Sequence, residues 1–352
     1  MKHTKTPRGR LVLTGVAIGL AGLMAMLSAT TMIAAASVNA GSINIGYENN
    51  GADPSIISVA NGYFQKELGS QVQLKLFSSG PAALSALASG ALPFMCGLGF
   101  PPVIAALAKQ VPLQVVFNQE RYTQDAGLVV RSSSGITTVA QLKGKTVAIV
   151  IGSQSSFELA DFVKAAGISL SSIHELDMSP PEMQSAWATG QIQAAIVWDP
   201  VFDYLSSHGG RILASDANLP PTATSFNICV ANKGYAAAHP VVAAAFEKAL
   251  GDGVNYLNAH PTQALAVMAK AAGITVATAK TEIAGYDIFS LSDQTSADVL
   301  GSGKGTGSSG TAQSLLNNWK VLYAAGVITT APPASAAAYV NSTYAAEAIS
   351  ST

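Results

Sequence analysis

Short apolar runs alternate with longer helical stretches along most of the chain, and this alternation limits the folds it can adopt. Strands are predicted at residues 43–47, 72–77, 94–98, 113–117, 146–151 and 192–198. Helices are predicted between them, for example after Ser78-Ser79-Gly80-Pro81, because serine is a good N-cap and proline is tolerated in the first turn. The pattern is typical of an α/β architecture with largely parallel strands.

An internal similarity indicates two lobes. Residues 85–92, SALASGAL, resemble residues 185–192, SAWATGQI. In both, a helix is expected to end at a glycine and lead directly into a strand. The chain would leave the first block through Leu128–Arg131 and return through Phe226–Ala231, which predicts a two-strand hinge. We expect one lobe from residues 41–128 and 226–352 and a second from 129–225. Helices at 239–257, 261–272, 276–286 and 312–325 would complete the first lobe.

The first forty residues have the features of an export signal. An apolar run from Leu11 to about Ala36 precedes Val38-Asn39-Ala40, a small-residue cleavage pattern. The basic residues before it are Lys2, Lys5, Arg8 and Arg10. An uncleaved anchor helix is the alternative, because the run exceeds the ~7 to 15 residues usual for a signal core. Cleavage is preferred, since small and hydroxyl residues dilute the second half of the run. The protein is therefore expected in the periplasm.

Composition excludes two classes of protein. Only 11% of the 352 residues are charged and the formal net charge is −1, so the clustered basic residues of a nucleic-acid binder are missing. Hydrophobic residues make up 49%, which excludes a disordered chain. Removing residues 1–40 takes away four basic and no acidic side chains, so the net charge falls from −1 to −5.

Two cysteines, Cys96 and Cys229, each lie in an apolar, strand-like run. Export would permit a disulfide between them, whereas buried free thiols are the alternative, and the sequence leaves both open. Two cysteines fit no zinc motif of the C-x-x-C type. No metal or other cofactor is expected.

Three helix starts follow strands and share small or hydroxyl side chains: Ser78-Ser79-Gly80, Gly97-Leu98-Gly99 and Ser153–Ser156. In an α/β fold the ligand binds where the carboxyl ends of strands meet helix N-termini. Free N–H groups and the helix dipole can hold an anion there without Lys or Arg. Plain N-capping explains any one of these segments, but three at matching positions favour a bound anion.

The chain resembles the periplasmic taurine-binding and aliphatic-sulfonate-binding proteins of ABC importers, within the nitrate, sulfonate and taurine group. The resemblance rests on the order of short motifs over nearly all of the chain after residue 40. They are Gly46-Tyr47 with Asp53-Pro54, Phe77-Ser78-Ser79-Gly80, Ala86–Gly90, Lys109–Pro112, Leu142–Lys145, Pro180-Pro181, Val197-Trp198-Asp199-Pro200 and His239–Val242. It implies a type II periplasmic binding protein fold, a monomer that closes on a small organic anion and delivers it to an ABC permease and its ATPase.

The resemblance also implies roles for individual residues. Ser79, Gly80, Ser153 and Ser155 would surround a sulfonate, and Asp199 would face the ammonium group of a ligand such as taurine. The full expected set is Glu48, Ser79, Gly80, Gly99, Phe100, Ser153, Ser155, Ser156, Trp198, Asp199 and Asn227. Glu120 and Asp125 are further candidates for the ammonium. The alternatives are a surface turn for Asp199 and a core position for Trp198.

Two departures from the family pattern leave the substrate open. Phe100-Pro101-Pro102 stands where hydroxyl residues are usual, and proline donates no N–H. Ala126 stands where an acidic residue is expected, with Asp125 one place earlier. A bulkier sulfonate or another small amphoteric anion therefore remains an alternative to taurine.

Enzyme motifs are absent from the sequence. Gly152-Ser153-Gln154-Ser155 lacks the second glycine of a nucleophile elbow. Gly303-Lys304-Gly305-Thr306 lacks a Ser or Thr directly after the lysine of a phosphate loop, and it fits a flexible loop over 301–310 better. We expect a binding protein. The alternatives are an enzyme on the same fold, such as a thiamine pyrimidine-precursor synthase, and a periplasmic ligand sensor.

Overall fold

The computed structural model describes residues 42–219, 226–303 and 307–351. The predicted export signal and part of the predicted 301–310 loop lie outside these ranges. None of the helices in the described ranges combines the length and apolar character that a membrane span requires.

The first of two sheets has six strands in the order β11-β4-β10-β3-β1-β2. The central strand β3 is buried along its whole length, as a continuous apolar run predicts. Parallel pairs join β1 to β2 and β3, whereas β10 runs antiparallel to β3 and β4. The strands are β1 (Ile43–Glu48), β2 (Val72–Phe77), β3 (Phe94–Leu98), β4 (Leu113–Tyr122), β10 (Phe226–Asn232) and β11 (Tyr286–Ile288).

The second sheet has five strands in the order β7-β6-β8-β5-β9. The parallel pairs join β6 to β7 and β8, and β5 runs antiparallel to β8 and β9. The strands are β5 (Ala126–Arg131), β6 (Thr146–Ile149), β7 (His174–Asp177), β8 (Ala194–Trp198) and β9 (Gly210–Ser215). All four residues of β7 are exposed, so this edge strand has no apolar alternation by which the sequence could predict it.

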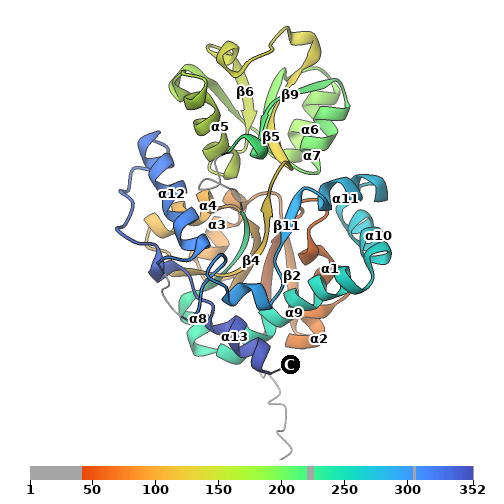
Figure 1. The fold of residues 1–352 in the computed structure, drawn as a ribbon, viewed down its shortest axis with the longest axis vertical. Coiled ribbons are helices and arrows are strands. Elements are labelled where there is room, and N and C mark those ends of the chain that lie inside the picture. The colour runs from red at the N-terminus through yellow and green to blue at the C-terminus, as the bar shows by residue number, and fades with distance from the viewer. Residues whose placement is uncertain (1–41, 220–225, 304–306, 352) are drawn as a thin grey trace, which may run out of the picture. The chain divides into compact units, whose positions relative to one another are not determined.

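The expected two-lobed α/β fold class is confirmed, with two mixed sheets (Figure 1). The chain passes from the first sheet to the second between Tyr122 and Ala126, and after β9 it re-enters the first sheet at Phe226. The helix-connected neighbours β1 and β2, and β6 and β7, pair in parallel as predicted. The sheets are not largely parallel, however, because five of the nine strand pairs among the described residues are antiparallel. Strands that enter a sheet directly from the other one, β5 and β10, have no such crossover and pair antiparallel.

The helices cover the two sheets (Figure 1). Asp53 begins α1, since its carboxylate accepts the N–H of Ser55 at 2.6 Å. Two helices lie between β1 and β2, and they are separated at Gly62 with φ 72°. The helices are α1 (Pro54–Ala60), α2 (Tyr63–Leu68), α3 (Gly80–Ala88), α4 (Phe100–Ala108), α5 (Gln154–Ala165), α6 (Pro180–Ala188), α7 (Val201–Ser207), α8 (Lys233–Ala238), α9 (Pro240–Ala259), α10 (Pro261–Ala272), α11 (Val276–Ile283), α12 (Gly310–Ala324) and α13 (Thr343–Ser350).

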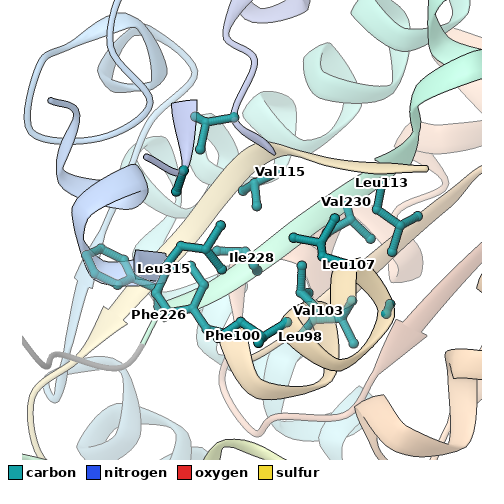
Figure 2. Close-up of a cluster of buried hydrophobic side chains, with 14 of the residues drawn as sticks. Leu98, Phe100, Val103, Leu107, Leu113, Val115, Phe226, Ile228, Val230 and Leu315 are labelled. Atoms are coloured by element: carbon teal, nitrogen blue, oxygen red, sulfur yellow. The ribbon is translucent and has the colours of Figure 1, made fainter. Parts of the chain in front are cut away.

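One buried cluster lies between the first sheet and helices α4 and α12 (Figure 2). Phe100 at the start of α4 is fully buried, and its ring centroid lies 5.8 Å from that of Phe226 on β10. Leu315 of α12 packs into the same cluster. Burying a side chain of this size contributes about 1.5–3 kcal/mol. This core therefore fixes the start of α4 against the sheet.

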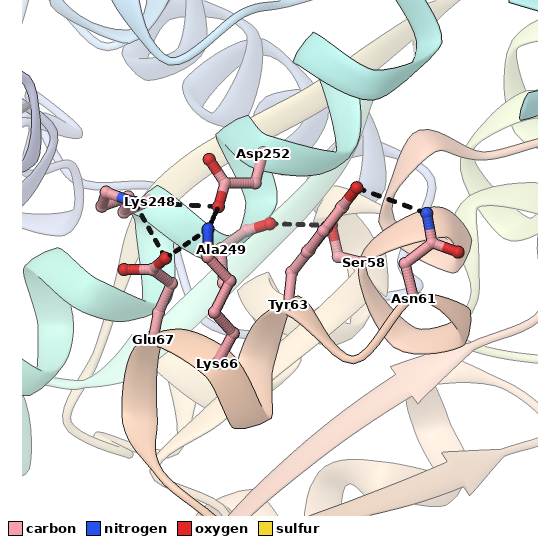
Figure 3. A network of polar contacts seen from close by, with 8 residues as sticks. All are labelled: Ser58, Asn61, Tyr63, Lys66, Glu67, Lys248, Ala249 and Asp252. Atoms are coloured by element: carbon pink, nitrogen blue, oxygen red, sulfur yellow. Dashed lines mark hydrogen bonds and ion pairs between the residues drawn. The ribbon is translucent and has the colours of Figure 1, made fainter. Parts of the chain in front are cut away.

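Polar contacts join helices α1 and α2 to α9 (Figure 3). The Lys66 Nζ lies 2.9 Å from Oε1 of Glu67 and 2.8 Å from Oδ2 of Asp252. The Lys248 Nζ lies 2.9 Å from the same oxygen of Glu67. The Ser58 hydroxyl donates to the carbonyl of Ala249 at 2.8 Å. Because the Lys66 side chain is 59% exposed, its ion pairs add little stability.

Cys96 and Cys229 form a disulfide, which decides between the two alternatives that the sequence left open. Cys96 lies on β3 and Cys229 on the neighbouring strand β10, and both residues are buried. The bond therefore links adjacent strands that lie 133 residues apart in the sequence.

Candidate ligand-binding site

A small cavity is enclosed by residues from both halves of the molecule. Its volume of about 20 Å³ is room for about one water molecule. The ends of β1, β3 and β4 and the start of β10 line it from the first sheet, and the end of β8 and the start of α5 line it from the second. The lining residues are Glu48, Asn50, Gly80, Gly97, Gly99, Pro102, Tyr122, Ser153, Gln154, Glu158, Trp198, Phe226 and Asn227.

Three helix N-termini converge on this cavity, at Gly80 of α3, Gly99 before α4 and Ser153 before α5. Gly80 has no room for a side chain, because a Cβ atom there would lie 2.7 Å from Cγ of Pro102. The Ser153 hydroxyl caps α5 by accepting the N–H of Ser155 at 3.2 Å, and it donates to the carbonyl of Val150 at 2.7 Å. The backbone at these positions can approach an anion closely.

Buried carboxyl groups border the same cavity. Glu48 and Glu158 line it and are only 4% and 1% exposed. Glu120 contacts the lining residue Asn227, whose side-chain amide donates to Oε1 of Glu120 at 2.5 Å. Burial raises the pKa of both Glu48 and Glu120 well above the ordinary value. None of the described lining residues is a Lys or Arg.

A chain of hydrogen-bonded side-chain amides lies beside the cavity. The Asn50 side chain donates to the carbonyl of Gly97 at 3.0 Å and to the amide oxygen of Asn227 at 3.1 Å. Gln119 accepts the N–H of Gly97 at 2.7 Å and donates to Asp53 at 2.7 Å. These buried amides hold Gly97, which is next to the disulfide residue Cys96. The amide N–H groups of Asn50 donate to Gly97 and Asn227, and the side-chain amide of Asn227 donates to Glu120.

A second group of acids lies near the crossing between the sheets. Asp199 follows β8, and its carboxylate caps α7 by accepting the N–H of Asp203 at 2.9 Å. The N–H of Asp199 donates to the carbonyl of Asp125 at 3.0 Å. Glu282 of α11 accepts the N–H of Ala52 at 2.8 Å. Burial raises the pKa of Asp125 to about 8 and that of Glu282 to about 7, and it also raises the pKa of Asp199.

A wider groove of about 800 Å³ opens beside the cavity. Asn49, Ser78 and Pro200 line it, and each is within two residues of a residue that lines the cavity. Most residues that line the groove are exposed or half-buried, whereas every residue that lines the cavity is buried except the half-buried Gly99. We therefore take the cavity as the candidate site and the groove as its outer mouth.

Comparisons with known proteins identify the family. A family profile described as "NMT1/THI5 like" matches residues 50–264. The chain belongs to the NMT1/THI5-like family. The taurine-binding periplasmic protein of Escherichia coli (strain K12) is 29% identical over 243 residues, which cover 68% of this chain and 75% of that protein. A putative aliphatic sulfonates-binding protein from the same strain is 27% identical, over 60% of this chain and 65% of the relative.

Solved structures share the fold of this NMT1/THI5-like protein. The alkanesulfonate-binding protein SsuA from Xanthomonas axonopodis pv. citri, bound to MOPS, has a TM-score of 0.67 at 21% identity and covers 84% of this chain and 96% of SsuA. The desulfurization enzyme DSZB has a TM-score of 0.61 at 13% identity, with 88% and 99% covered. The fold is thus compatible with both binding proteins and an enzyme, and the site has to decide between them.

The structure brings together only part of the residue set that the sequence predicted for this NMT1/THI5-like protein. Glu48, Gly80, Gly99, Ser153, Trp198 and Asn227 line the cavity. The lining does not include Ser79, Phe100, Ser155, Ser156 or Asp199. Phe100 packs in the core, and the backbone N–H of Ser155 and the carboxylate of Asp199 take part in helix caps.

Sequence reasoning missed the lining residues Asn50, Gly97, Pro102, Tyr122, Gln154, Glu158 and Phe226. Two signals could have indicated some of them. Asn50 lies in the turn directly after the first strand. Glu158 follows Gln154 by four residues, so both lie on the same face of α5.

Proposed function

We propose that this protein is the substrate-binding component of an ABC importer. It is exported to the periplasm, captures taurine or a related small sulfonate in the cavity between its lobes, and delivers it as a monomer to a membrane permease and its ATPase. The supporting observation is one enclosed cavity, lined from both sheets, that combines three helix N-termini with buried carboxyl groups. The names of the E. coli relatives point to the same ligand class.

The cavity suits a ligand that carries both charges. The helix N-termini at Gly80, Gly99 and Ser153 offer positive ends of helix dipoles to a sulfonate. Glu48 offers a carboxylate to an ammonium group. A buried carboxylate is costly unless it is paired, and a ligand cation supplies that pair.

Closure of the lobes would trap the ligand. A cavity with room for about one water molecule cannot admit taurine as it stands, so the lobes must separate for entry. The two crossings, before Ala126 of β5 and at Phe226 of β10, are the proposed hinge. We propose that the lobes are residues 41–128 with 226–352, and 129–225. Strand β5 begins at Ala126 and pairs in the second sheet. This supports a first crossing a few residues before the proposed boundary at residue 128.

Calorimetry on the purified protein tests this function. The panel consists of taurine, ethanesulfonate, longer alkanesulfonates, sulfate and nitrate, each also measured as a thermal shift. We expect a sulfonate to give the strongest stabilisation, about 2.7 kcal/mol at a concentration of 100 times Kd. Preferential binding of nitrate or of a thiamine precursor, or no sulfonate binding, would contradict the proposal.

A further inference from the structure

The groove beside the candidate cavity is by far the larger of the two spaces. The cavity has a volume of about 20 Å³, room for about one water molecule, whereas the groove has a volume of about 800 Å³. Pockets that bind small organic molecules usually have volumes of about 300–1,000 Å³. The groove therefore has room for the organic part of a ligand, and the cavity does not.

Three segments of the chain line both spaces. Asn49 lines the groove, and its two neighbours in the chain line the cavity. Ser78 lines the groove two residues before Gly80 of the cavity. Pro200 lines the groove two residues after Trp198 of the cavity. A ligand with its anionic group at the cavity can therefore extend into the groove.

Both halves of the molecule contribute to the groove. Residues 76–78, at the end of β2, and residues around the junction of α10 and α11 line it from the half that holds the first sheet (Figure 1). The start of α6 and one side of α7 line it from the half that holds the second sheet. An organic group in the groove therefore contacts both halves at once.

Apolar and ring side chains make up much of the groove wall. Leu76 is a large hydrophobic residue, yet it is 60% exposed. Phe77 lines the groove, and the rings of Tyr204 and His208 stack with their centroids 4.0 Å apart. Among the described residues that line the groove, Asp203 is the single Asp, Glu, Lys or Arg. An apolar group that covers this wall removes apolar surface from water, which favours binding.

Several polar groups of the groove already have partners within the chain. The Asn49 side chain donates to a backbone carbonyl at the end of α10 at 3.1 Å. The hydroxyl oxygens of Thr275 and Thr278 lie 2.9 Å apart. Nδ1 of His208 lies 2.8 Å from the carbonyl oxygen of Tyr204. The wall is therefore better suited to an apolar group than to a second charged group of the ligand.

We propose that the groove binds the apolar organic group of a sulfonate larger than taurine, while the sulfonate itself binds at the helix N-termini of the cavity. Leu76, Tyr204 and Ile274 are then specificity-determining residues, because they line the groove and contact this group. The inference rests on the proposed function, because the anionic end of the ligand lies in the same cavity. A two-carbon ligand such as taurine leaves most of the groove to water.

Straight-chain alkanesulfonates with two, four, six and eight carbons test the proposal by calorimetry. Each CH₂ group that enters the groove should tighten binding about fourfold. Thr278→Trp places a large side chain in the groove. Thr281→Trp is its matched control, because Thr281 lies on the same helix but does not line the groove. Thermal unfolding of each variant confirms that it is folded.

A second pair of variants removes apolar surface instead of adding bulk. Leu76→Ser lies on β2, an edge strand of the first sheet, and Ile212→Ser lies on β9, an edge strand of the second. Both side chains are exposed large hydrophobics, but only Leu76 lines the groove. Leu76→Ser should reduce the gain in affinity per carbon, and Ile212→Ser should leave it as in the wild type.

We expect the wild type to bind hexanesulfonate at least about tenfold more tightly than ethanesulfonate. Thr278→Trp should weaken octanesulfonate at least about tenfold more than it weakens ethanesulfonate. The control Thr281→Trp should weaken both ligands equally or not at all. An affinity that is independent of chain length, or equal effects of the two tryptophan variants, would overturn the proposal.

Alkanoates of the same chain lengths separate this inference from the proposed function. If sulfonates bind without regard to chain length, the function stands and the groove proposal fails. If no sulfonate binds, but octanoate binds and loses affinity in Thr278→Trp, the groove stands as a site for an apolar group and the sulfonate function fails. If neither series binds, both fail.

Sedimentation tests the other occupant of such a groove, a second copy of the chain. The proposal expects the wild type and Thr278→Trp to sediment alike as monomers. A wild-type dimer that dissociates in Thr278→Trp, but not in Thr281→Trp, would assign the groove to an interface between two copies and would overturn the proposal.

Discussion

Gly99 lies so close to Gln154 that a Cβ atom on Gly99 would be 2.8 Å from Cβ of Gln154. Gly99 precedes α4, which packs against the first sheet, and Gln154 begins α5, which belongs to the second. Neighbouring side chains do not approach this closely, so only glycine lets the two helix N-termini meet. Both residues line the candidate site.

Replacing Gly99 with alanine should therefore hinder closure more than folding. Overpacking of about 1–3 kcal/mol in the closed form corresponds to a loss of ligand affinity of roughly 5- to 150-fold. Calorimetry with the best ligand of the sulfonate panel measures it. Gly234→Ala in α8, where the nearest atom would lie 3.5 Å away, is the control and should bind as the wild type does. Equal affinities for both variants would show that this contact does not limit closure.

Buried acids should make the protein more stable at mildly acidic pH than at alkaline pH. Burial raises the pKa of Asp53 to about 6, of Glu282 to about 7 and of Asp125 to about 8. The folded state thus binds these protons more tightly than the unfolded state. Their contribution is complete below about pH 4 and is lost as the pH rises through 6 to 8.

Urea denaturation at pH 5 and pH 8 measures this effect. We expect the free energy of unfolding to be lower at pH 8 by at least about 1 kcal/mol, since one pKa unit corresponds to about 1.4 kcal/mol. Glu282→Gln, which cannot ionise, should reduce the difference. A stability that increases from pH 5 to pH 8 would contradict the assignment of these groups.

Reduction of the Cys96–Cys229 disulfide should destabilise the fold substantially. The bond closes a loop across 133 residues, and restricting the unfolded chain by such a loop is worth up to about 5 kcal/mol. Unfolding in urea with and without dithiothreitol measures the loss, for which we expect about 2–5 kcal/mol. The double variant Cys96→Ala/Cys229→Ala should behave like the reduced protein and be insensitive to dithiothreitol. An unchanged urea midpoint on reduction would argue against a stabilising role.

The amide of Asn227 should be needed for stability as well as for the site. It donates to Glu120, which is fully buried, and accepts from Asn50. Asn227→Ala removes the donor to Glu120 and one of the two acceptors of the Asn50 amide, at a cost of about 1–3 kcal/mol in the free energy of unfolding. Asn61→Ala, at an exposed position, is the comparison and should change stability by less than about 0.5 kcal/mol. Equal urea midpoints for the two variants would contradict this role.

Several parts of the fold follow from local patterns. The buried strands β1, β3 and β8 and the long helices α9 and α10 lie close to the ranges predicted, because apolar periodicity and caps are local properties. Strands β7, β9 and β11 were not predicted. They lie at the edges of the sheets, where β7 buries none of its residues and leaves no hydrophobic signal.

The sequence alone determined the alternation of strands and helices, the positions of the helix starts at Gly80, Gly99 and Ser153, and the place of Glu48 at a strand end. Each of these depends on residues adjacent in the chain. Only the tertiary structure decided that Cys96 pairs with Cys229 and that Glu158 shares a cavity with Glu48. Those relationships join residues that packing brings together across more than a hundred positions or from the other sheet, and no local pattern encodes such distances.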